Sequence, residues 1–194
     1  MNQAYLNIKN INTLGDILNY VKSVKNPNDL IIFFDFDDTI CDPDYDSVIE
    51  PTITRELFEY MTKHKIFFSI ITGRFYNSAC DDRIRNVKDM KDNILDSIYP
   101  PLKSLGLDVS KQEKDTTVYK IFNENNVCVG ILFMGIFFTG KKGETIKNYI
   151  RMMNMSKKEI LFIDDYEPYL VETTTSVPEI KAYRRLPPYA NSIY

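Results

Sequence analysis

The stretch FFDFDDTI (33–40) constrains this fold more than any other, because it joins apolar residues directly to a cluster of carboxylates. It overlaps the run LIIFF (30–34), which is apolar throughout and has the length of a strand. Such a run is typical of a strand that is buried on both faces, as in parallel sheets. Asp35 and Asp37 follow it at once, at the end of the strand where such sheets bind their ligands. The stretch therefore predicts a buried parallel strand that ends in a polar site.

The same pattern occurs twice more along the chain. KIFFSIITGR (65–74) and EILFIDD (159–165) each join an apolar strand to polar residues. Segments with helical spacing of apolar residues separate the strands, at 13–24, 52–64, 75–98 and 142–153. Strands that alternate with helices predict an α/β fold, a three-layer Rossmann-like sandwich around a central, mainly parallel sheet.

Residues 116–138 interrupt this alternation. TTVYKIF, NENN and VCVGILFMGIFFT are typical of a strand, a turn and a strand, so we expect a small β-hairpin insert. Only about 30 residues separate Asp37 from Ser69, which leaves no room for a large cap domain there. We expect one domain over residues 1–194, made of a helix with its lead-in, a core that holds the hairpin, and a C-terminal helix and strand, at 1–29, 30–166 and 167–194.

The composition excludes several classes of protein. With 194 residues, 44% of them hydrophobic and 26% charged, the chain suits one globular core rather than a disordered or fibrous protein. A net charge of −3 argues against a nucleic-acid partner that is bound mainly through attraction to its phosphate backbone. No run suits a signal peptide or a membrane span, so we expect a soluble cytoplasmic protein with no membrane partner. The odd number and wide spacing of the cysteines predict buried free thiols at Cys41, Cys80 and Cys128.

Four acids lie at the ends of two predicted strands, Asp35 and Asp37 at one and Asp164 and Asp165 at the other. If the strands are parallel neighbours, these carboxylates meet at one edge of the sheet. Two carboxylates about 4 Å apart repel each other by about 4 kcal/mol at an effective dielectric constant of about 20. A hard divalent cation with oxygen ligands relieves such repulsion, so the acids predict a Mg²⁺ site.

Acids at a strand end beside a magnesium ion suit phosphoryl transfer. A carboxylate can attack phosphorus and form an aspartyl-phosphate, which water then hydrolyses. A second acid two residues later can protonate the leaving oxygen and afterwards activate that water. A hydroxyl, a backbone amide and a lysine are needed to hold the phosphate oxygens. Thr72, the amides near Gly73, and Lys142 can supply these groups.

Four segments together resemble a known family. FFDFDDT, SIITGR, GKKGETI and ILFIDD resemble motifs I to IV of the haloacid dehalogenase (HAD) superfamily, in that order, over about residues 30–166. LKSLGLDVS and GIFFTGKKGE further resemble an uncharacterised branch of that superfamily, known as a domain of unknown function. Four motifs in order are much more specific than the first motif alone.

The resemblance implies a role for each polar residue at the strand ends. Its implied catalytic residues are Asp35 as nucleophile, Asp37 as acid and base, Thr72 as phosphate-binding hydroxyl and Lys142 as charge neutraliser. Its implied metal ligands are Asp35, Asp164 and the carbonyl of Asp37, with Asp165 as a direct or outer ligand. Lys141 stands beside Lys142, and we prefer Lys142 because a glycine follows it. Arg74 is either a surface residue or a bidentate ligand of the substrate phosphate.

The resemblance thus implies a Mg²⁺-dependent phosphatase that acts through an aspartyl-phosphate. Minimally capped members of the superfamily often act on macromolecular phosphates or borrow a lid from a neighbouring subunit. The implied substrates are a phosphorylated small molecule, a phosphoprotein or a nucleic-acid end, and a homo-oligomer is compatible with this reading. A catalytically silent HAD fold that binds a partner is the main alternative.

Other readings of the same residues are weaker. Residues 135–142 approach a nucleotide-binding loop, but Lys142 stands where that loop needs Ser or Thr. A calcium loop begun at Asp42 lacks its glycine and its final glutamate. A receiver-like phospho-acceptor domain carries its paired acids first and its acceptor later, the reverse of this order. The single histidine, His64, lies in polar surroundings at a predicted helix end, which argues against a Ser-His-Asp site.

Overall fold

A large, mainly parallel sheet forms the centre of the computed structural model, which describes residues 8–74, 80, 92, 94, 96–107, 118–155 and 158–187. The sheet has eight strands in the order β1-β10-β9-β2-β5-β8-β7-β6 among these residues, and the first six run parallel. β7 and β6 continue it antiparallel. In chain order the strands of this sheet are β1 Ile8–Ile11, β2 Leu30–Phe34, β5 Phe67–Thr72, β6 Tyr119–Phe122, β7 Cys128–Phe133, β8 Ile136–Phe138, β9 Glu159–Asp164 and β10 Lys181–Arg185. The predicted α/β class is confirmed.

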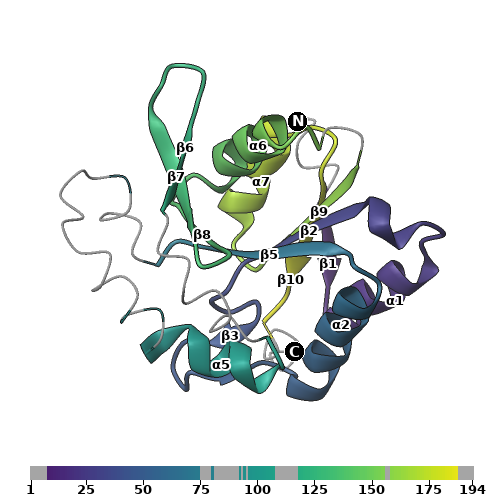
Figure 1. Cartoon of the computed structure of the whole chain (residues 1–194). Coiled ribbons are helices and arrows are strands. Elements are labelled where there is room, and N and C mark those ends of the chain that lie inside the picture. The colour runs from purple at the N-terminus through teal and green to yellow at the C-terminus, as the bar shows by residue number, and fades with distance from the viewer. Residues whose placement is uncertain are drawn as a thin grey trace.

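Helices cover both faces of this sheet (Figure 1). On one face lie α6 (Lys142–Met152) and α7 (Glu167–Ser176), which pack against each other. On the other lie α1 (Leu14–Ser23), α2 (Pro51–Lys63) and the short α5 (Tyr99–Ser104). A 3₁₀ turn, η2 (Pro27–Asp29), leads into β2.

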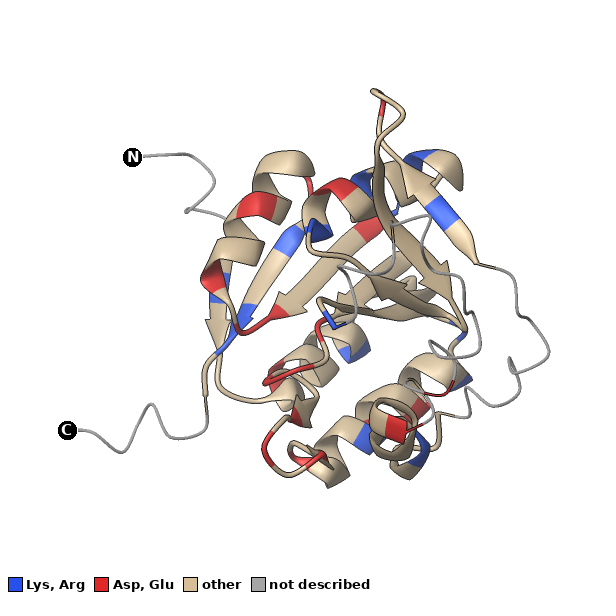
Figure 2. Cartoon of the chain, turned by 90° about the vertical axis from the view of Figure 1, so that its left-hand side faces the viewer, with Lys and Arg blue, Asp and Glu red and all other residues tan. Residues whose placement is uncertain are grey.

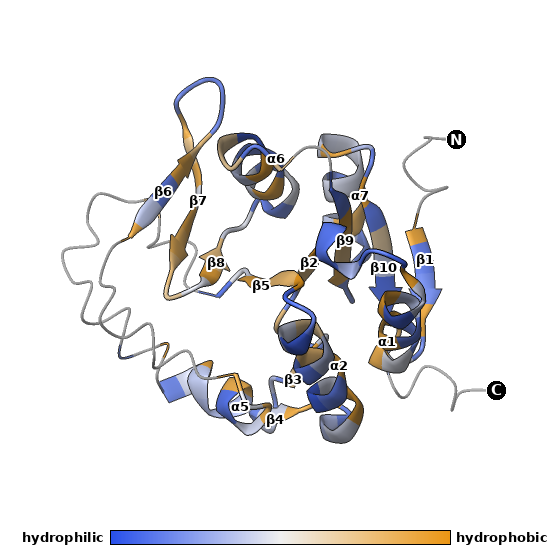
Figure 3. Ribbon diagram, turned by 45° about the vertical axis from the view of Figure 1, so that its right-hand side comes forward, coloured by the Kyte–Doolittle hydropathy of each residue, from blue (hydrophilic) through white to orange (hydrophobic). Residues whose placement is uncertain are grey.

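The strand β2 supplies side chains to both apolar cores of the fold. Ile32 and Phe34 pack in the core that includes α1 and α2, whereas Ile31 and Phe33 pack in the core that includes α6. All five residues of β2 are buried, as the continuous apolar run predicts. Figure 3, coloured by hydropathy, shows hydrophobic strands at the centre of the fold and helices of mixed or polar character outside them.

Helix α1 begins as its sequence predicts. Thr13 is the N-cap, and its hydroxyl accepts a hydrogen bond from the amide of Gly15 at 2.8 Å. Asp16 completes the capping box by accepting from the amide of Thr13 at 3.4 Å. The apolar residues at helical spacing are all buried, namely Leu14, Ile17, Leu18 and Val21. Local sequence therefore determines both the start and the buried face of this helix.

Two predictions about strands are wrong. Residues 1–29 were expected to hold only a helix and its lead-in, but β1 pairs with β10 at the edge of the sheet. The run 127–139 was expected to form one strand of an insert, but it folds into β7 and β8, and β8 pairs parallel with β5 as part of the central sheet. Met134 and Gly135 make the turn between them, with φ of 51° and 76°. An apolar methionine at a positive φ gives no turn signal in the sequence, and both strands are apolar, so the run resembles one continuous strand.

The cysteine prediction is wrong for two of the three residues. Cys80 and Cys128 form a disulfide, across 48 positions of sequence. Cys41 is a buried free thiol, as expected. Sequence spacing did not reveal the pair because the two residues meet only in the tertiary structure, across 48 positions of sequence.

The remaining segments agree with the prediction where they are described. Most of the predicted helix 75–98, including Val87 and Met90, lies outside the described residues, while Ile94 and Ile98 are buried. The turn-rich stretch after the first acids contains a two-stranded pair, β3 (Cys41–Asp42) and β4 (Ser47–Val48), and no large cap. No helix in the described part of the chain is both long enough and apolar enough to cross a membrane.

Candidate active site

The predicted polar residues meet at the carboxyl edge of the sheet. β9, β2 and β5 are parallel neighbours, so the residues at their ends lie side by side. Carboxylate oxygens of Asp35, Asp164 and Asp165 lie within 4.8 Å of one another. Figure 2 shows acidic positions, in red, in loops at the ends of the strands. The expected convergence of residues more than 100 positions apart is therefore present.

Lys142 places its ammonium inside this acidic group. It is the first residue of α6 and is only 1% exposed. Its Nζ donates to Asp35 Oδ1 and, at 2.8 Å, to Asp164 Oδ2. Lys141, by contrast, has a half-exposed side chain that pairs with Glu144 at 3.2 Å. Lys142 rather than Lys141 is thus the lysine of the site.

The charges of the site are poorly compensated by the protein. Burial raises the pKa of Asp35 well above its usual range, against the attraction of Lys142 and with added repulsion from Asp164. Burial likewise raises the pKa of Asp164, and burial with repulsion from Asp164 raises the pKa of Asp165 to about 6. Burial alone would lower the pKa of Lys142, but the two aspartates it contacts outweigh burial and raise it.

This donor set fits a hard divalent cation. Three carboxylates surround one ammonium, so the described group has a surplus of negative charge if all are ionised. All the candidate ligand atoms are carboxylate oxygens, which Mg²⁺ prefers. Asp35, Asp164 and Asp165 are the residues that could hold it. Additional positive charge here would stabilise the ionised carboxylates and so offset the burial that raises their pKa values.

Asp37 lies beside the acidic group but points its carboxylate to Arg74. Nε of Arg74 donates to both carboxylate oxygens, at 2.9 and 3.0 Å, and Nη2 donates to Oδ1 at 2.6 Å. The guanidinium also lies over the ring of Phe36, 5.0 Å from its centroid. Arg74 is therefore neither a free surface residue nor a vacant phosphate ligand in this structure, because it is paired with the second aspartate.

Thr72 and Gly73 lie at the end of β5, next to Asp35, which follows the end of β2. Thr72 is fully buried, and its hydroxyl accepts from the amide of Arg74 at 3.0 Å. Gly73 lies near Tyr169 and Thr139. A Cβ at this position would lie 3.7 Å from the hydroxyl of Tyr169 and 3.9 Å from the carbonyl oxygen of Thr139. The structure thus brings all the predicted site residues to one edge of the sheet.

Glu172 of α7 supports Lys142 from a place that no sequence motif marks. Its carboxylate accepts from the amides of Gly143 at 2.6 Å and Glu144 at 3.1 Å. These amides belong to the first turn of α6, where the N-cap Lys141 has no side-chain cap of its own. A carboxylate is favourable at a helix N-terminus. No local signal could identify Glu172, because it caps a different helix.

Arg185, at the end of β10, is a second supporting residue without a sequence signal. It is 1% exposed, and Nη1 donates to the carbonyl oxygen of Asp38 at 3.0 Å. Its Nη2 lies 3.6 Å from Glu50 Oε2. Arg185 therefore supports the loop that follows Asp37, from a strand more than 140 positions away in the sequence.

The close packing of Gly143 predicts a stability effect. A Cβ there would lie 2.7 Å from Cα of Thr173 and 2.9 Å from the carbonyl oxygen of Glu172, and backbone atoms cannot easily move away. Gly143→Ala is expected to lower the free energy of unfolding by about 1–3 kcal/mol, measured by chemical denaturation. Gly73→Ala is the matched control, because its Cβ meets only ordinary contacts. Equal stability of the two variants would contradict this account of the α6–α7 contact.

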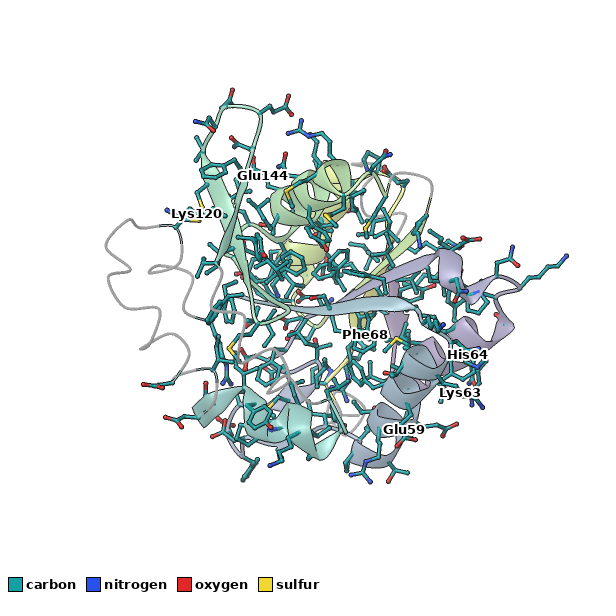
Figure 4. All side chains as sticks on the ribbon, in the orientation of Figure 1. Glu59, Lys63, His64, Phe68, Lys120 and Glu144 are labelled. Carbon is teal, nitrogen blue, oxygen red and sulfur yellow. A yellow bond between two sulfur atoms is a disulfide. The ribbon has the colours of Figure 1, made fainter. Side chains whose placement is uncertain are left out.

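Three alternative readings of the sequence do not fit these positions. Ile136–Phe138 form the buried strand β8, so residues 135–142 are not an open phosphate loop. The acids from Asp42 onward lie in the β3–β4 pair rather than in a helix–loop–helix. His64 ends α2, stacks on Tyr60 at 4.2 Å, and is half-buried rather than solvated. It precedes β5 and so lies at the amino edge of the sheet, near Phe68 at the start of that strand (Figure 4).

Comparisons of the chain with protein-family models, curated proteins and solved structures found no match. The function is therefore inferred from the geometry and charges of the site.

Proposed function

We propose that this protein is a Mg²⁺-dependent phosphatase of the HAD type, which hydrolyses phosphomonoesters through an aspartyl-phosphate on Asp35. The observation that carries the proposal is the buried ammonium of Lys142 between Asp35 and Asp164, with Asp165 beside them. Burying these charges costs free energy. Perturbed acids and a buried lysine at the ligand-binding edge of an α/β sheet are typical of a catalytic site.

In this proposal Asp35 is the nucleophile. Lys142 contacts Oδ1, so Oδ2 is the oxygen that attacks phosphorus. The new bond joins Oδ2 to phosphorus while the bond from phosphorus to the leaving oxygen breaks, and the bonding electrons stay on the leaving oxygen. The ammonium of Lys142, the hydroxyl of Thr72 and the amide of Gly73 would hold the phosphate oxygens. Mg²⁺, when bound by Asp35, Asp164 and Asp165 with the carbonyl of Asp37, would supply positive charge that stabilises the transferring phosphoryl group.

Asp37 is the proposed acid and base. In its protonated form it would give its proton to the leaving oxygen, and as a carboxylate it would then take a proton from the water that hydrolyses the aspartyl-phosphate. Arg74 holds Asp37 by both oxygens in this structure. A substrate phosphate is an alternative bidentate partner for the same guanidinium, so substrate binding would release Asp37 for proton transfer.

The substrate class is a phosphomonoester on a small molecule, a phosphoprotein or a nucleic-acid end. No large cap covers the site between Asp37 and Ser69, where α2 is the main element. A site without a large cap in this described segment is compatible with a bulky leaving group, or with a lid from a second subunit of a homo-oligomer. The Arg74–Asp37 pair also favours a second candidate, a catalytically silent HAD fold that binds a partner, because it occupies the carboxylate of the proposed acid and base.

Hydrolysis of an aryl phosphate tests the proposal directly. We expect release of aryl alcohol from p-nitrophenyl phosphate that requires Mg²⁺ and stops when a chelator removes it. Beryllofluoride, which mimics the acyl phosphate, should raise the thermal unfolding midpoint when Mg²⁺ is present. Folded protein that neither hydrolyses the ester nor binds beryllofluoride would overturn the phosphatase proposal and favour the silent fold.

A further inference from the structure

Tyr169 lies in the first turn of α7, immediately after the acids that end β9. The amide of Tyr166 donates to Asp164 Oδ1 at 2.8 Å, which ties the start of α7 to the acidic group. The ring of Tyr169 packs edge-on against the ring of Tyr166, with centroids 5.3 Å apart. The position of Tyr169 is therefore coupled to that of Asp164 through backbone and ring contacts.

The ring of Tyr169 is in contact with the central cation of the site. Nζ of Lys142 lies 4.4 Å from the ring centroid, while it also contacts Asp35 and Asp164. A cation over an aromatic face is attracted most strongly when it is removed from water. Lys142 is almost fully buried, so this ring helps to enclose and orient the ammonium.

The hydroxyl of Tyr169 reaches the opposite side of the site. It lies 3.7 Å from the position that a Cβ on Gly73 would take, and so adjoins the segment Thr72–Arg74. None of the protein hydrogen bonds found among the described residues involves this hydroxyl. The hydroxyl of Tyr169, a hydrogen-bond donor, thus lies between Lys142 and the segment Thr72–Arg74, where the proposed function places the phosphate oxygens.

We propose that Tyr169 binds the substrate phosphate, its hydroxyl donating a hydrogen bond to a phosphate oxygen while its ring holds Lys142. This inference rests on the proposed function for the place of the phosphate. Two substitutions separate the role of the hydroxyl from the role of the ring. Tyr169→Phe removes the hydroxyl and keeps the ring, whereas Tyr169→Leu removes both.

Binding of inorganic phosphate, measured by calorimetry with Mg²⁺ present, tests the hydroxyl. A hydrogen bond to a charged oxygen predicts that Tyr169→Phe weakens phosphate binding by about 10-fold to 100-fold. The KM for p-nitrophenyl phosphate should rise with it, while the thermal midpoint and the affinity for Mg²⁺ stay as in the wild type.

Tyr169→Leu should in addition lower kcat, because Lys142 loses the ring that orients it. Tyr60→Phe, at the amino edge of the sheet, is the matched control and should change nothing.

The outcomes separate this inference from the proposed function. If the wild type hydrolyses the ester and Tyr169→Phe binds phosphate within twofold of it, the inference about Tyr169 is wrong and the phosphatase proposal stands. If phosphate binds in a Tyr169-dependent way without any hydrolysis, the phosphatase proposal fails and the role of Tyr169 holds. If the folded wild type neither binds phosphate nor hydrolyses the ester, both are overturned.

Discussion

Asp35→Asn is expected to lower kcat/KM for p-nitrophenyl phosphate by at least about 1,000-fold, because an amide oxygen is a far weaker nucleophile than a carboxylate. The substituted asparagine also cannot form the acyl phosphate, so beryllofluoride should no longer raise the thermal midpoint. The measurement is steady-state kinetics at saturating Mg²⁺. Asp29→Asn, at an exposed acid before β2, is the control and should keep wild-type activity. Substantial activity in Asp35→Asn would exclude Asp35 as the nucleophile.

The same substitution should not destabilise the fold. The pKa of Asp35 is raised in the folded state, above all by burial, so the folded protein holds this proton more tightly than the unfolded chain does. The ionised carboxylate therefore costs stability once the pH rises above its ordinary, unfolded-state pKa. Asparagine removes that cost. In metal-free buffer, the thermal midpoint of Asp35→Asn minus that of the wild type should therefore be more positive at pH 7 than at pH 4. A midpoint well below that of the wild type at pH 7 would show that Asp35 is structural.

Lys142→Met is expected to lower the free energy of unfolding by about 3–5 kcal/mol in metal-free buffer, the largest stability effect that we predict. The reason is that Asp35 and Asp164 are both buried and share this one ammonium. Removing it leaves two carboxylates that must either stay charged without a partner or take up protons. Chemical denaturation measures the loss, and phosphatase activity should disappear with it.

Lys141→Met is the matched control for this experiment. Its ammonium is half-exposed and pairs only with Glu144 within the described residues, so its loss should cost about 0.5 kcal/mol or less. Adding Asp164→Asn to Lys142→Met should recover part of the stability, because one of the two uncompensated charges is removed as well. If Lys142→Met were no more costly than Lys141→Met, the buried charge group described above would be wrong.

The sequence by itself determined the features that depend on near neighbours along the chain. The capping box of Thr13 and Asp16 and the buried face of α1 follow from residues within a few positions of one another. The buried strand β2 follows from five successive apolar residues. The positions of Asp35, Thr72 and Asp164 at strand ends follow in the same way, so these three residues of the candidate site could be predicted from local patterns alone.

Only the tertiary structure decided how these parts pair. It split the apolar run 127–139 at Met134 and Gly135, and it joined Cys80 to Cys128. It also placed Lys142 rather than Lys141 in the acidic group.

The supporting residues of the site are likewise set by tertiary contacts. Glu172 caps the start of α6 from another helix, Arg74 holds Asp37, and Tyr169 covers the ammonium of Lys142. Periodicity and capping report interactions within one turn or one strand, whereas these contacts depend on which elements become neighbours when the sheet and its helices pack. Residues far apart in sequence carry no mark of that choice, because it is made by the burial of whole faces rather than by any single pair.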